Sequence, residues 1–396
     1  MAIKIGIDIR SLVDPEPTGV GTYTRMMVNT LQAVAPDLEL KLYASGRRER
    51  SLRELGIAEE PGTTLTWTKK PNKILNARTV ALGTPLLDRQ VGGVDVWFSP
   101  NINFTSLSAH VPHVVTVHDL SYHLYPGFFS GKRRVWHSAT RAAAMITQAT
   151  HIVCDSHSTA QDLRRVYGLA PEHVSVVWLG NDLVVFPTQS EVESTMAELQ
   201  LPKEYVVAIG TIEPRKNLVA LVRALEEVAW SRPELGLVLI GPYGWKNAAL
   251  RRVIKTSFLA ERIHVLGYLD GPQKNAVLAQ AKLLYCASSY EGFGLPLLEA
   301  MQLGVPVVTS NLSSLPEIAG EAAVLIDPER VDQSAQALLE LLRDQQAREM
   351  LRKSGRARAQ HFTWQKAGLE MAKVLRAVAE QGVGVVKPSV TPVEVV

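Results

Sequence analysis

Two glutamates of this 396-residue chain, Glu291 and Glu299, flank a glycine-containing turn. The apolar run 283–287 before the turn predicts a buried strand, and the stretch 295–304 after it has the composition of a helix that ends at a glycine. The free N–H groups at the start of a helix favour an anion such as phosphate, and glycines allow the backbone to approach a ligand closely. The stretch therefore predicts a ligand-binding turn between a strand and a helix.

The two carboxylates suit a second kind of ligand group. We expect Glu291 to lie before the helix and Glu299 in its first turn, so that both reach a ligand at the helix start. Carboxylates do not hold phosphate, but they accept hydrogen bonds from sugar hydroxyls. Phosphate together with sugar hydroxyls indicates a nucleotide sugar.

A pair of adjacent cations, Arg215 and Lys216, follows the predicted strand 205–210 at another strand-to-helix turn. An arginine binds phosphate oxygens through two parallel hydrogen bonds, and a lysine adds a point charge. Because the pair lies in the same half of the chain as the two glutamates, we expect it to bind the diphosphate of the same ligand.

The first half of the chain places a histidine at the end of a strand. The valine-rich run 111–118 predicts a buried parallel strand, and His118 and Asp119 stand at its carboxyl end, where open α/β sheets bind their ligands. The loop that follows, which includes Tyr122, is polar and aromatic and favours an exposed site.

A glycine loop at residues 18–21 separates the first predicted strand, 4–10, from a helix that we expect to begin at Thr22. Doubly wound sheets hold an anion or admit a substrate at this place. The Gly-Val-Gly sequence alone is equally typical of a tight turn.

Strands and helices alternate along the chain, and its length suits two domains, each with a parallel, doubly wound α/β sheet. Residues 46–73 are expected to be irregular, and 312–320 to form a loop. The expected strands are 4–10, 38–44, 94–99, 111–118, 151–156, 174–182 with a turn, 205–210, 236–241, 264–269, 283–287, 306–310 and 323–327. Helices are expected at 22–35, 74–87, 131–149, 158–167 with Ser158 as a cap, 271–281, 295–304, 331–362 and 364–379.

The spacing of Glu291 and Glu299 around Gly-Phe-Gly-Leu-Pro resembles the signature of the family 4 retaining glycosyltransferases of GT-B fold. The run 210–217, Gly-Thr-Ile-Glu-Pro-Arg-Lys-Asn, is similar to that of bacterial members that build surface polysaccharides, many of them mannosyltransferases. Many other relatives carry Arg where this chain has Thr211 and Gly where it has Asn217. The resemblance covers nearly the whole chain, with its specific motifs mainly between 205 and 320.

The resemblance implies roles for individual residues. His118 and Glu291 would be the catalytic residues, with His118 beside the donor sugar and Glu291 bound to its hydroxyls, while Glu299 would bind the ribose. The implied donor-binding residues are Gly21, Gly210, Thr211, Arg215, Lys216, Gly292, Phe293, Gly294, Leu295 and Glu299. The implied acceptor-side residues are Gly19, Asp119 and Tyr122.

The resemblance also implies a division of the chain. Residues 1–185 would form the acceptor-side domain, 186–203 a linker and 204–363 the domain that binds the nucleotide sugar, with the site between the domains. The helix 364–380 would return to the N-terminal domain, and 381–396 would be a loose tail.

The implied activity is that of a retaining α-glycosyltransferase without a cofactor. We expect it to move mannose from GDP-mannose to a lipid-linked oligosaccharide in O-antigen, capsule or exopolysaccharide synthesis. The sequence contains no Asp-x-Asp pair, so we expect no metal. The alternatives are another donor such as UDP-glucose or a deoxyhexose nucleotide, an epimerase of the same fold, or a non-catalytic sugar-nucleotide-binding protein. A NAD dehydrogenase is disfavoured because the first glycine loop lacks the Gly-x-Gly-x-x-Gly spacing.

The net charge of +3 at pH 7 is too small to indicate nucleic-acid binding. All the excess positive charge lies in residues 1–190, which fits an anionic membrane surface or a phosphorylated acceptor. The expected helix 131–149 carries basic residues around Trp136 that could rest on such a membrane.

Cys154 and Cys286 each lie in an apolar strand-like run and are expected to be core residues of a reduced cytoplasmic protein. The start of the chain does not resemble a signal peptide, and no apolar stretch approaches 18 residues. We expect a cytoplasmic protein with at most a peripheral contact at the inner face of the membrane.

Overall fold

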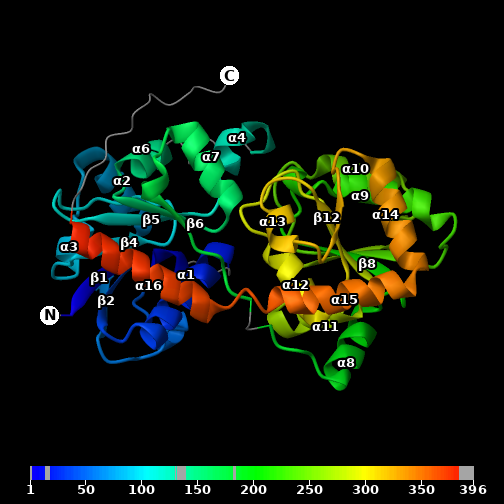
Figure 1. Cartoon of the computed structure of the whole chain (residues 1–396), viewed down its shortest axis with the longest axis horizontal. Helices are drawn as coiled ribbons and strands as arrows, with labels where there is room; N and C mark the ends of the chain where they lie inside the picture. Colours follow the sequence, from blue (N-terminus) through cyan, green and yellow to red (C-terminus); the bar gives the residue numbers. More distant parts are fainter. Residues whose placement is uncertain (1, 14–17, 130, 132–139, 182–183, 383–396) are drawn as a thin grey trace. The chain divides into compact units, whose positions relative to one another are not determined.

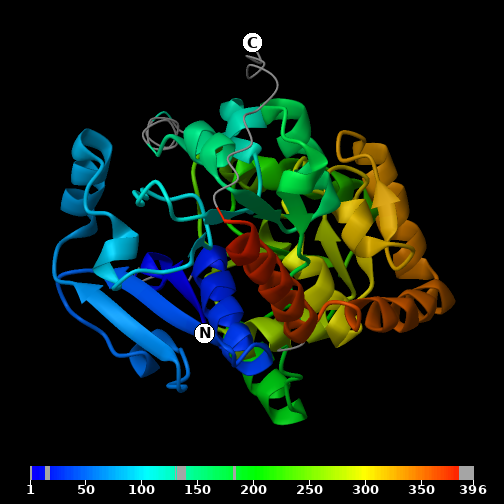
Figure 2. The ribbon, with the colours of Figure 1, turned by 60° about the vertical axis from the view of Figure 1, so that its left-hand side comes forward.

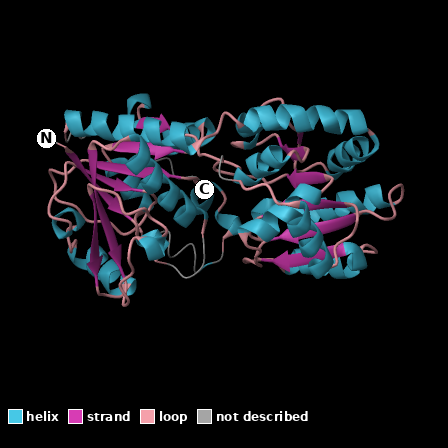
Figure 3. Cartoon of the chain, turned by 90° about the horizontal axis from the view of Figure 1, so that it is seen from below, coloured by secondary structure: helices cyan, strands magenta, loops and turns pink. Residues whose placement is uncertain are grey.

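The computed structural model (Figure 1) describes all residues except 1, 14–17, 130, 132–139, 182–183 and 383–396. Its contacts divide the chain into two compact units. The first unit consists of Met1–Leu120, Lys132–Gly180 and Thr363–Val396, and the second of Ser121–Gly131 and Asn181–Phe362. Each unit contains one sheet of parallel strands between helices (Figure 3).

The first unit is built on a seven-stranded sheet in the order β3-β2-β1-β4-β5-β6-β7. The strands are buried apolar runs because helices cover both faces of a parallel sheet. They are β1 Ile3–Asp8, β2 Leu38–Ser45, β3 Thr63–Thr68, β4 Val96–Ser99, β5 His113–Val117, β6 His151–Cys154 and β7 Val174–Val176. With the exception of β3, each lies where the sequence predicts a strand.

The strand β3 corrects the expectation of irregular structure over 46–73. It pairs with β2 from Leu40 opposite Thr63 to Ser45 opposite Thr68. Its sequence, Thr-Thr-Leu-Thr-Trp-Thr, has few apolar residues because β3 lies at the edge of the sheet and is only partly buried. A half-buried edge strand lacks the continuous apolar run of a central strand.

The helices of the first unit lie on both faces of its sheet. They are α1 Gly19–Val34, α2 Asn72–Leu82, α3 Leu87–Gln90, α6 Ala142–Gln148, α7 His157–Tyr167 and α16 Trp364–Gln381. Figure 2 shows α1, in blue, beside α16, in red, and the two helices pack together. The Tyr23 hydroxyl of α1 bonds the Thr116 hydroxyl of β5 at 2.9 Å, so α1 lies on the face of the sheet to which Thr116 points.

Two helix starts differ from the sequence expectation. α1 begins at Gly19 rather than Thr22, because the Thr18 side chain accepts from the Gly21 N–H and caps the helix. α7 is capped by Ser156 instead of Ser158, through a bond from the Thr159 N–H. In both cases a hydroxyl earlier in the chain captures the first free N–H groups.

The expected helix 74–87 is divided into two helices, and the expected helix 131–149 is described only in part. Gly83, in the left-handed region at φ 61°, ends α2, and α3 is a separate short helix. Within 131–149, the structure describes α6 together with residues 131, 140, 141 and 149. Of the residues on which the expected membrane contact rests, Arg141 is described, whereas Lys132, Arg133, Arg134 and Trp136 lie outside the described residues.

The connection from β4 to β5 contains no helix, although all of residues 100–112 are described. Parallel strands are usually joined by a crossover helix that covers one face of the sheet. Here an irregular loop replaces that helix. The face of β5 to which His113 points, opposite to the Thr116 side, therefore receives no helix from this connection.

The second unit is built on a six-stranded sheet in the order β10-β9-β8-β11-β12-β13. Its strands are β8 Tyr205–Ile209, β9 Gly236–Ile240, β10 Ile263–Gly267, β11 Leu283–Cys286, β12 Val307–Ser310 and β13 Val324–Ile326. Its helices include α4 Ser121–Leu124, α8 Gln189–Leu199, α9 Leu218–Ala229, α10 Ala248–Thr256, α11 Gly271–Gln280, α12 Leu295–Leu303, α13 Leu315–Ala319, α14 Val331–Arg343 and α15 Gln345–Ala359.

The strand and helix predicted around Glu291 are confirmed: β11 ends at Cys286, and α12 ends before Gly304, which is left-handed at φ 75°. One expectation nearby is wrong, because the expected loop 312–320 contains α13. The stretch 331–362 is largely helical, as expected, and consists of α14 and α15, which is capped by Asp344 through the Ala347 N–H.

The stretch Ser121–Gly131 follows β5 directly in the chain, but its contacts place it in the second unit. The Trp245 indole N–H donates to the Phe128 carbonyl at 2.5 Å, and its ring stacks on Phe129 with 5.7 Å between centroids. The Tyr125 ring lies 5.3 Å from that of Tyr290. Aromatic contacts therefore hold this stretch beside the turn that carries Glu291.

We predict that Gly180→Ala destabilises the first unit. A Cβ at Gly180 would lie 2.2 Å from the backbone N of Trp364, and backbone cannot move aside as a flexible side chain does. The loss should be about 1–3 kcal/mol in urea unfolding monitored by circular dichroism. In the control Gly271→Ala, the new Cβ meets nothing within 4 Å, and stability should be unchanged or slightly higher. Equal stability of both variants would contradict the close contact.

Candidate active site

Two loops at the carboxyl ends of neighbouring strands carry the candidate donor-binding residues of the second unit. β8 leads into the short helix η5, Pro214–Lys216, and β11 leads into the turn before α12. β8 and β11 pair directly in the sheet. This topology brings Arg215 and Lys216 next to Glu291, although about 75 residues separate them in the chain.

The Glu291 carboxylate bonds both cations. Arg215 Nη1 lies 2.7 Å from Oε2, and Lys216 Nζ lies 2.5 Å from Oε1. The Ser288 hydroxyl also donates to Oε1 at 2.6 Å. Burial acts to raise the pKa of Glu291, but the charges of Arg215 and Lys216 outweigh it and lower the pKa to about 2. Glu291 is therefore a carboxylate at any physiological pH.

Arg215 and Lys216 differ in the donors they have left. Arg215 donates through Nη1 to Glu291 and to the Tyr290 carbonyl, and through Nε and Nη2 to Glu213. The guanidinium is thus committed to holding the loop together. The Lys216 ammonium has three donors, and its one partner among the described residues is Glu291. Lys216 therefore has N–H groups to offer a ligand.

The backbone beside Lys216 uses two left-handed positions. Gly210 has φ 130°, and a Cβ there would lie 3.0 Å from Lys216 Cε, so the glycine leaves room for the lysine chain. Asn217 has φ 53°, and its side chain donates to the Pro328 carbonyl at 2.6 Å. Asparagine is the residue other than glycine that best tolerates this region. Thr211 lies next to Gly210, and a Cβ on Gly244 would lie 2.7 Å from its methyl group.

The turn before α12 is held by two serines that the sequence reasoning missed. The Ser313 hydroxyl accepts from the Glu291 N–H at 2.9 Å. The Ser314 hydroxyl lies 2.9 Å from the Glu291 carbonyl and 2.8 Å from the Phe293 carbonyl. Gly294 enters α12 at φ 118°, a conformation that favours glycine. These contacts fix the backbone at the start of the helix.

The remaining donor-side candidates of this turn differ in exposure. The Phe293 ring is buried edge-on against Phe362, with 5.9 Å between centroids, so its side chain belongs to the core. Leu295, the first residue of α12, is partly exposed, and Gly292 lies buried between Glu291 and Phe293. Gly292 and Leu295 can contact a ligand through their backbone, because they lie at the start of α12.

Glu299 does not lie in the first turn of α12, contrary to expectation. The helix begins at Leu295, so Glu299 is its fifth residue. Its carboxylate accepts from Lys274 of α11 at 2.6 Å. Lys274 is a partner that sequence reasoning missed, and the two side chains form an ion pair separate from that of Glu291.

In the first unit, His118 follows β5 and Asp155 follows β6, which pairs with β5. His118 Nδ1 lies 2.7 Å from Asp155 Oδ2, and Nε2 lies 3.0 Å from the Pro100 carbonyl. The Tyr23 ring meets the imidazole edge-on at 4.7 Å. The sequence reasoning found His118 but missed Asp155 and Tyr23, because the chain separates them widely.

The surroundings of His118 favour its protonated form. Burial opposes the charge, but the Asp155 carboxylate outweighs it and raises the pKa of His118 above its usual 6.5. Both ring nitrogens face oxygens, and the Pro100 carbonyl can only accept. Burial in turn raises the pKa of Asp155. The pair is thus an imidazolium held by a carboxylate.

The glycines of the expected loop lie inside α1, and the acceptor-side candidates fall in both units. Gly19 and Gly21 form the first turn of α1, and the Gly21 N–H already donates to Thr18 at 3.0 Å. Asp119 follows His118 and adds to the negative field around it. Tyr122 lies in α4, which belongs to the second unit and not to the acceptor-side domain.

The residues that the structure describes contain no group of three or more His, Cys, Asp and Glu side chains that could hold a metal ion. In the same part of the chain, no helix combines the length and the apolar character needed to cross a membrane. Cys154 and Cys286 are both buried, as predicted.

Comparison with solved structures shows the fold. Sucrose-phosphate synthase from Thermosynechococcus elongatus matches with a TM-score of 0.73 and 20% identity, over 96% of this chain and 100% of that one. The Anabaena HepE protein, solved with UDP-glucose, matches with a TM-score of 0.70 and 18% identity, over 95% and 100%. Two doubly wound units with these neighbours define the GT-B fold.

Comparison of sequences gives the family. The model named Glycosyltransferase Family 4 matches residues 17–185, and the model named Glycosyl transferases group 1 matches 184–358. The O-antigen chain mannosyltransferase B of Escherichia coli is 31% identical over 88% of this chain and 93% of its own length. The MMP alpha-(1->4)-mannosyltransferase of Mycolicibacterium hassiacum is 30% identical over 57% and 54%. The chain belongs to the family 4 glycosyltransferases.

We predict that Asp155→Asn lowers the pKa of His118 below 6.5, because the burial that opposes the charge remains and the carboxylate is lost. NMR titration of the imidazole measures this shift. In wild type, the raised pKa adds stability fully below about pH 6.5, and this stability is lost as pH rises through the folded-state pKa. Asp162→Asn, which removes the partner of the exposed Arg165, should leave the titration unchanged. An unaltered pKa in Asp155→Asn would refute the pairing.

Proposed function

We propose that this chain is a retaining α-mannosyltransferase that moves mannose from GDP-mannose to a lipid-linked oligosaccharide in polysaccharide synthesis. Relatives named as mannosyltransferases support the sugar, and one of them is named for the O-antigen chain. The observation that carries the proposal is the contact of Glu291 with Arg215 and Lys216 at the start of α12.

The donor diphosphate binds to Lys216 and to the N–H groups at the start of α12. Departure of the nucleoside diphosphate places negative charge on its oxygens, and a preorganised cation and helix start stabilise that charge as it develops. Arg215 acts as a positioning residue, because its donors already hold Glu213, Tyr290 and Glu291.

Glu291 binds hydroxyls of the donor sugar. A carboxylate has about four sites for accepted hydrogen bonds, and Arg215, Lys216 and Ser288 use three of them. One site remains for a sugar hydroxyl. Glu299, already oriented by Lys274, is the proposed partner of the ribose.

The reaction then needs little further chemistry. The bond between the anomeric carbon and the diphosphate oxygen breaks, and the acceptor hydroxyl oxygen bonds that carbon on the same face. The hydroxyl proton passes to the departing phosphate oxygen, and the configuration is retained. His118 is the proposed contributor from the first unit, as a cation held by Asp155. The absence of an Asp-x-Asp pair from the sequence supports metal independence.

A peripheral contact with anionic membrane is part of the proposal. α2 exposes the apolar side chains of Ile74, Val80 and Leu82 together with the cations Lys73 and Arg78. Apolar groups and cations on one short helix suit the interface of an anionic lipid layer. Such a contact would place the protein at the cytoplasmic face, where a lipid-linked acceptor is present.

A different donor and acceptor form the second candidate. A relative from Jonesia denitrificans named D-inositol 3-phosphate glycosyltransferase is 29% identical over 58% of this chain and 57% of its own length. The neighbour HepE was solved with UDP-glucose. These observations make UDP-glucose a second donor to test beside GDP-mannose.

We predict that Lys216→Ala lowers transfer about 10²–10³-fold, because it removes a cation from the developing diphosphate charge. Glu291→Gln should lower transfer as well, since the neutral amide no longer pairs with the two cations. Product formation by mass spectrometry measures both. Lys282→Ala, which breaks an exposed ion pair with Glu204 in the same unit, is the control and should keep activity. Wild-type rates in both site variants would sink the assignment.

We further predict that GDP-mannose gives the largest thermal shift among nucleotide sugars, because binding to the folded state alone raises its stability. Transfer from it should persist in excess chelator and give an α-linked product by NMR. A larger thermal shift with UDP-glucose would contradict GDP-mannose as the donor and favour UDP-glucose instead. Loss of transfer in chelator with recovery on adding Mg²⁺ would contradict metal independence.

A further inference from the structure

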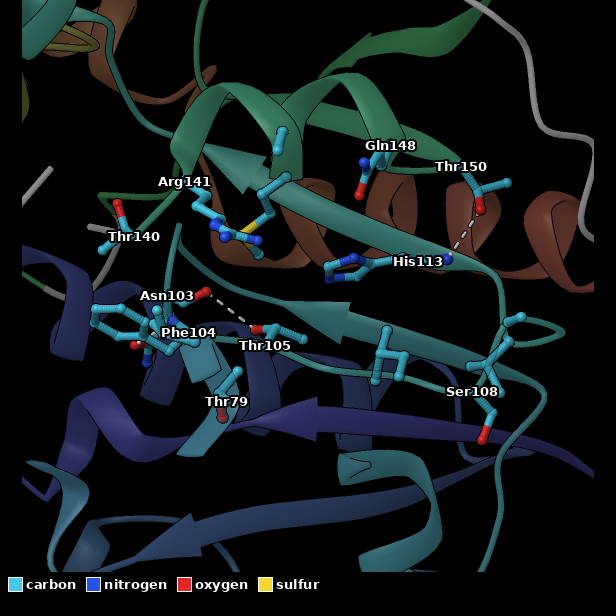
Figure 4. Close-up of a pocket in the computed structure, with 16 residues that line it drawn as sticks. Thr79, Asn103, Phe104, Thr105, Ser108, His113, Thr140, Arg141, Gln148 and Thr150 are labelled. Atoms are coloured by element: carbon cyan, nitrogen blue, oxygen red, sulfur yellow. Dashed lines mark hydrogen bonds between the residues drawn. The ribbon is translucent and has the colours of Figure 1, made fainter. Parts of the chain in front are cut away.

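A pocket of about 380 Å³ is lined only by residues of the first unit (Figure 4). It lies on the His113 side of β5, which receives no helix from the connection 100–112. Its volume falls in the range of about 300–1,000 Å³ typical of small-molecule sites. The side chains that shape it come from α2, from the connection 103–111, from His113 of β5 and from α6.

The pocket is lined by polar but mostly uncharged groups. Hydroxyls of Thr79, Thr105 and Thr150 alternate with apolar side chains such as Phe104 and Met145. Among the described lining residues there is no Asp or Glu. Hydroxyls and amides with an aromatic face suit the mixed surface of a sugar ring, whereas a lipid chain requires a uniformly apolar lining.

Three side chains of the pocket have donors available. The Arg141 guanidinium, Asn103 Nδ2 and the Gln148 side-chain amide form no hydrogen bond or ion pair with any other described residue. Arg141 precedes α6 and is exposed, at a left-handed φ of 52°. An arginine without a carboxylate partner, in a lining without acids, is a binding group for an anionic oxygen.

The pocket runs along the sheet from its carboxyl edge. At one end, the Phe104 carbonyl accepts from Arg10, which follows β1. At the other end, His113 begins β5 and bonds the Ser99 hydroxyl at 2.9 Å. Burial lowers the pKa of His113 to about 4, so this end is uncharged. Figure 4 shows Arg141, Asn103 and Phe104 at the end to which the strands point.

We propose that this pocket binds a sugar ring of the acceptor, with a neighbouring phosphate of the acceptor at Arg141. The uncharged hydroxyls and amides bind the ring, and the guanidinium binds the phosphate at the carboxyl edge, the edge that also carries His118. This proposal rests on the proposed function, since it names the chemistry of the acceptor: a saccharide joined to phosphate.

The test measures binding of α-mannose 1-phosphate by calorimetry, in a Lys216→Ala background that weakens the donor site. Arg141→Gln in this background should weaken binding about tenfold or more, the value of a hydrogen bond to a charged group. Ala144→Phe, which fills the pocket from α6, should also abolish binding. The matched control is Arg165→Gln, an exposed arginine of the same unit outside the pocket.

Three outcomes would overturn the proposal. One is equal affinity for α-mannose 1-phosphate with and without Arg141. The second is equal affinity for inorganic phosphate, which would reduce the pocket to an anion site. The third is binding that persists in Ala144→Phe when circular dichroism shows an unchanged fold.

Failure of the proposed function would look different. Wild-type protein would then transfer no sugar from any donor, while Arg141→Gln would still weaken the binding of α-mannose 1-phosphate. Conversely, Arg141→Gln should leave the GDP-mannose thermal shift intact, because the cluster proposed to bind the donor is built from Arg215, Lys216 and Glu291 and does not include Arg141.

Discussion

The second unit depends on one buried carboxylate. Glu291 binds Arg215 and Lys216, and a buried charge is tolerated only when it is paired and hydrogen-bonded. Removal of one partner of such a pair typically costs about 3–5 kcal/mol, because the other charge stays buried. The same bonds join the loop after β8 to the turn before α12. The need to neutralise Glu291 therefore fixes the positions of these two loops. Because Lys216 has Glu291 as its one partner among the described residues, some of its N–H groups remain available to a ligand.

The first unit repeats this principle with other residues. His118 and Asp155 lie at the ends of the neighbouring strands β5 and β6, as Lys216 and Glu291 follow β8 and β11. In a parallel sheet all carboxyl ends lie on one edge, so residues far apart in sequence meet there. Each unit thus places a paired charge at that edge. The two carboxylates differ, because the pKa of Glu291 is lowered and the pKa of Asp155 is raised.

Much of the fold could be predicted, because central parallel strands are continuous apolar runs. The edge strand β3 escaped prediction because half-burial leaves a threonine-rich sequence, and α13 because it is a single short helix in a polar stretch. Within the site, motif spacing identified Glu291, Arg215 and Lys216. Asp155, Lys274, Ser313 and Ser314 could not be found, since their roles arise only from tertiary neighbours. Glu299 shows the same limit, because its place in the second turn of α12 depends on where the helix begins.

The helix-free connection between β4 and β5 has a consequence for how such enzymes diversify. Residues 100–112 lie outside the strand pairing, so changes in their sequence or length reshape the pocket without altering the register of the sheet. The cluster around Glu291 belongs to the other unit and is built from other loops. Under the proposed assignment of the pocket, recognition of new acceptors could evolve through this one loop, while the proposed donor site in the second unit is inherited unchanged.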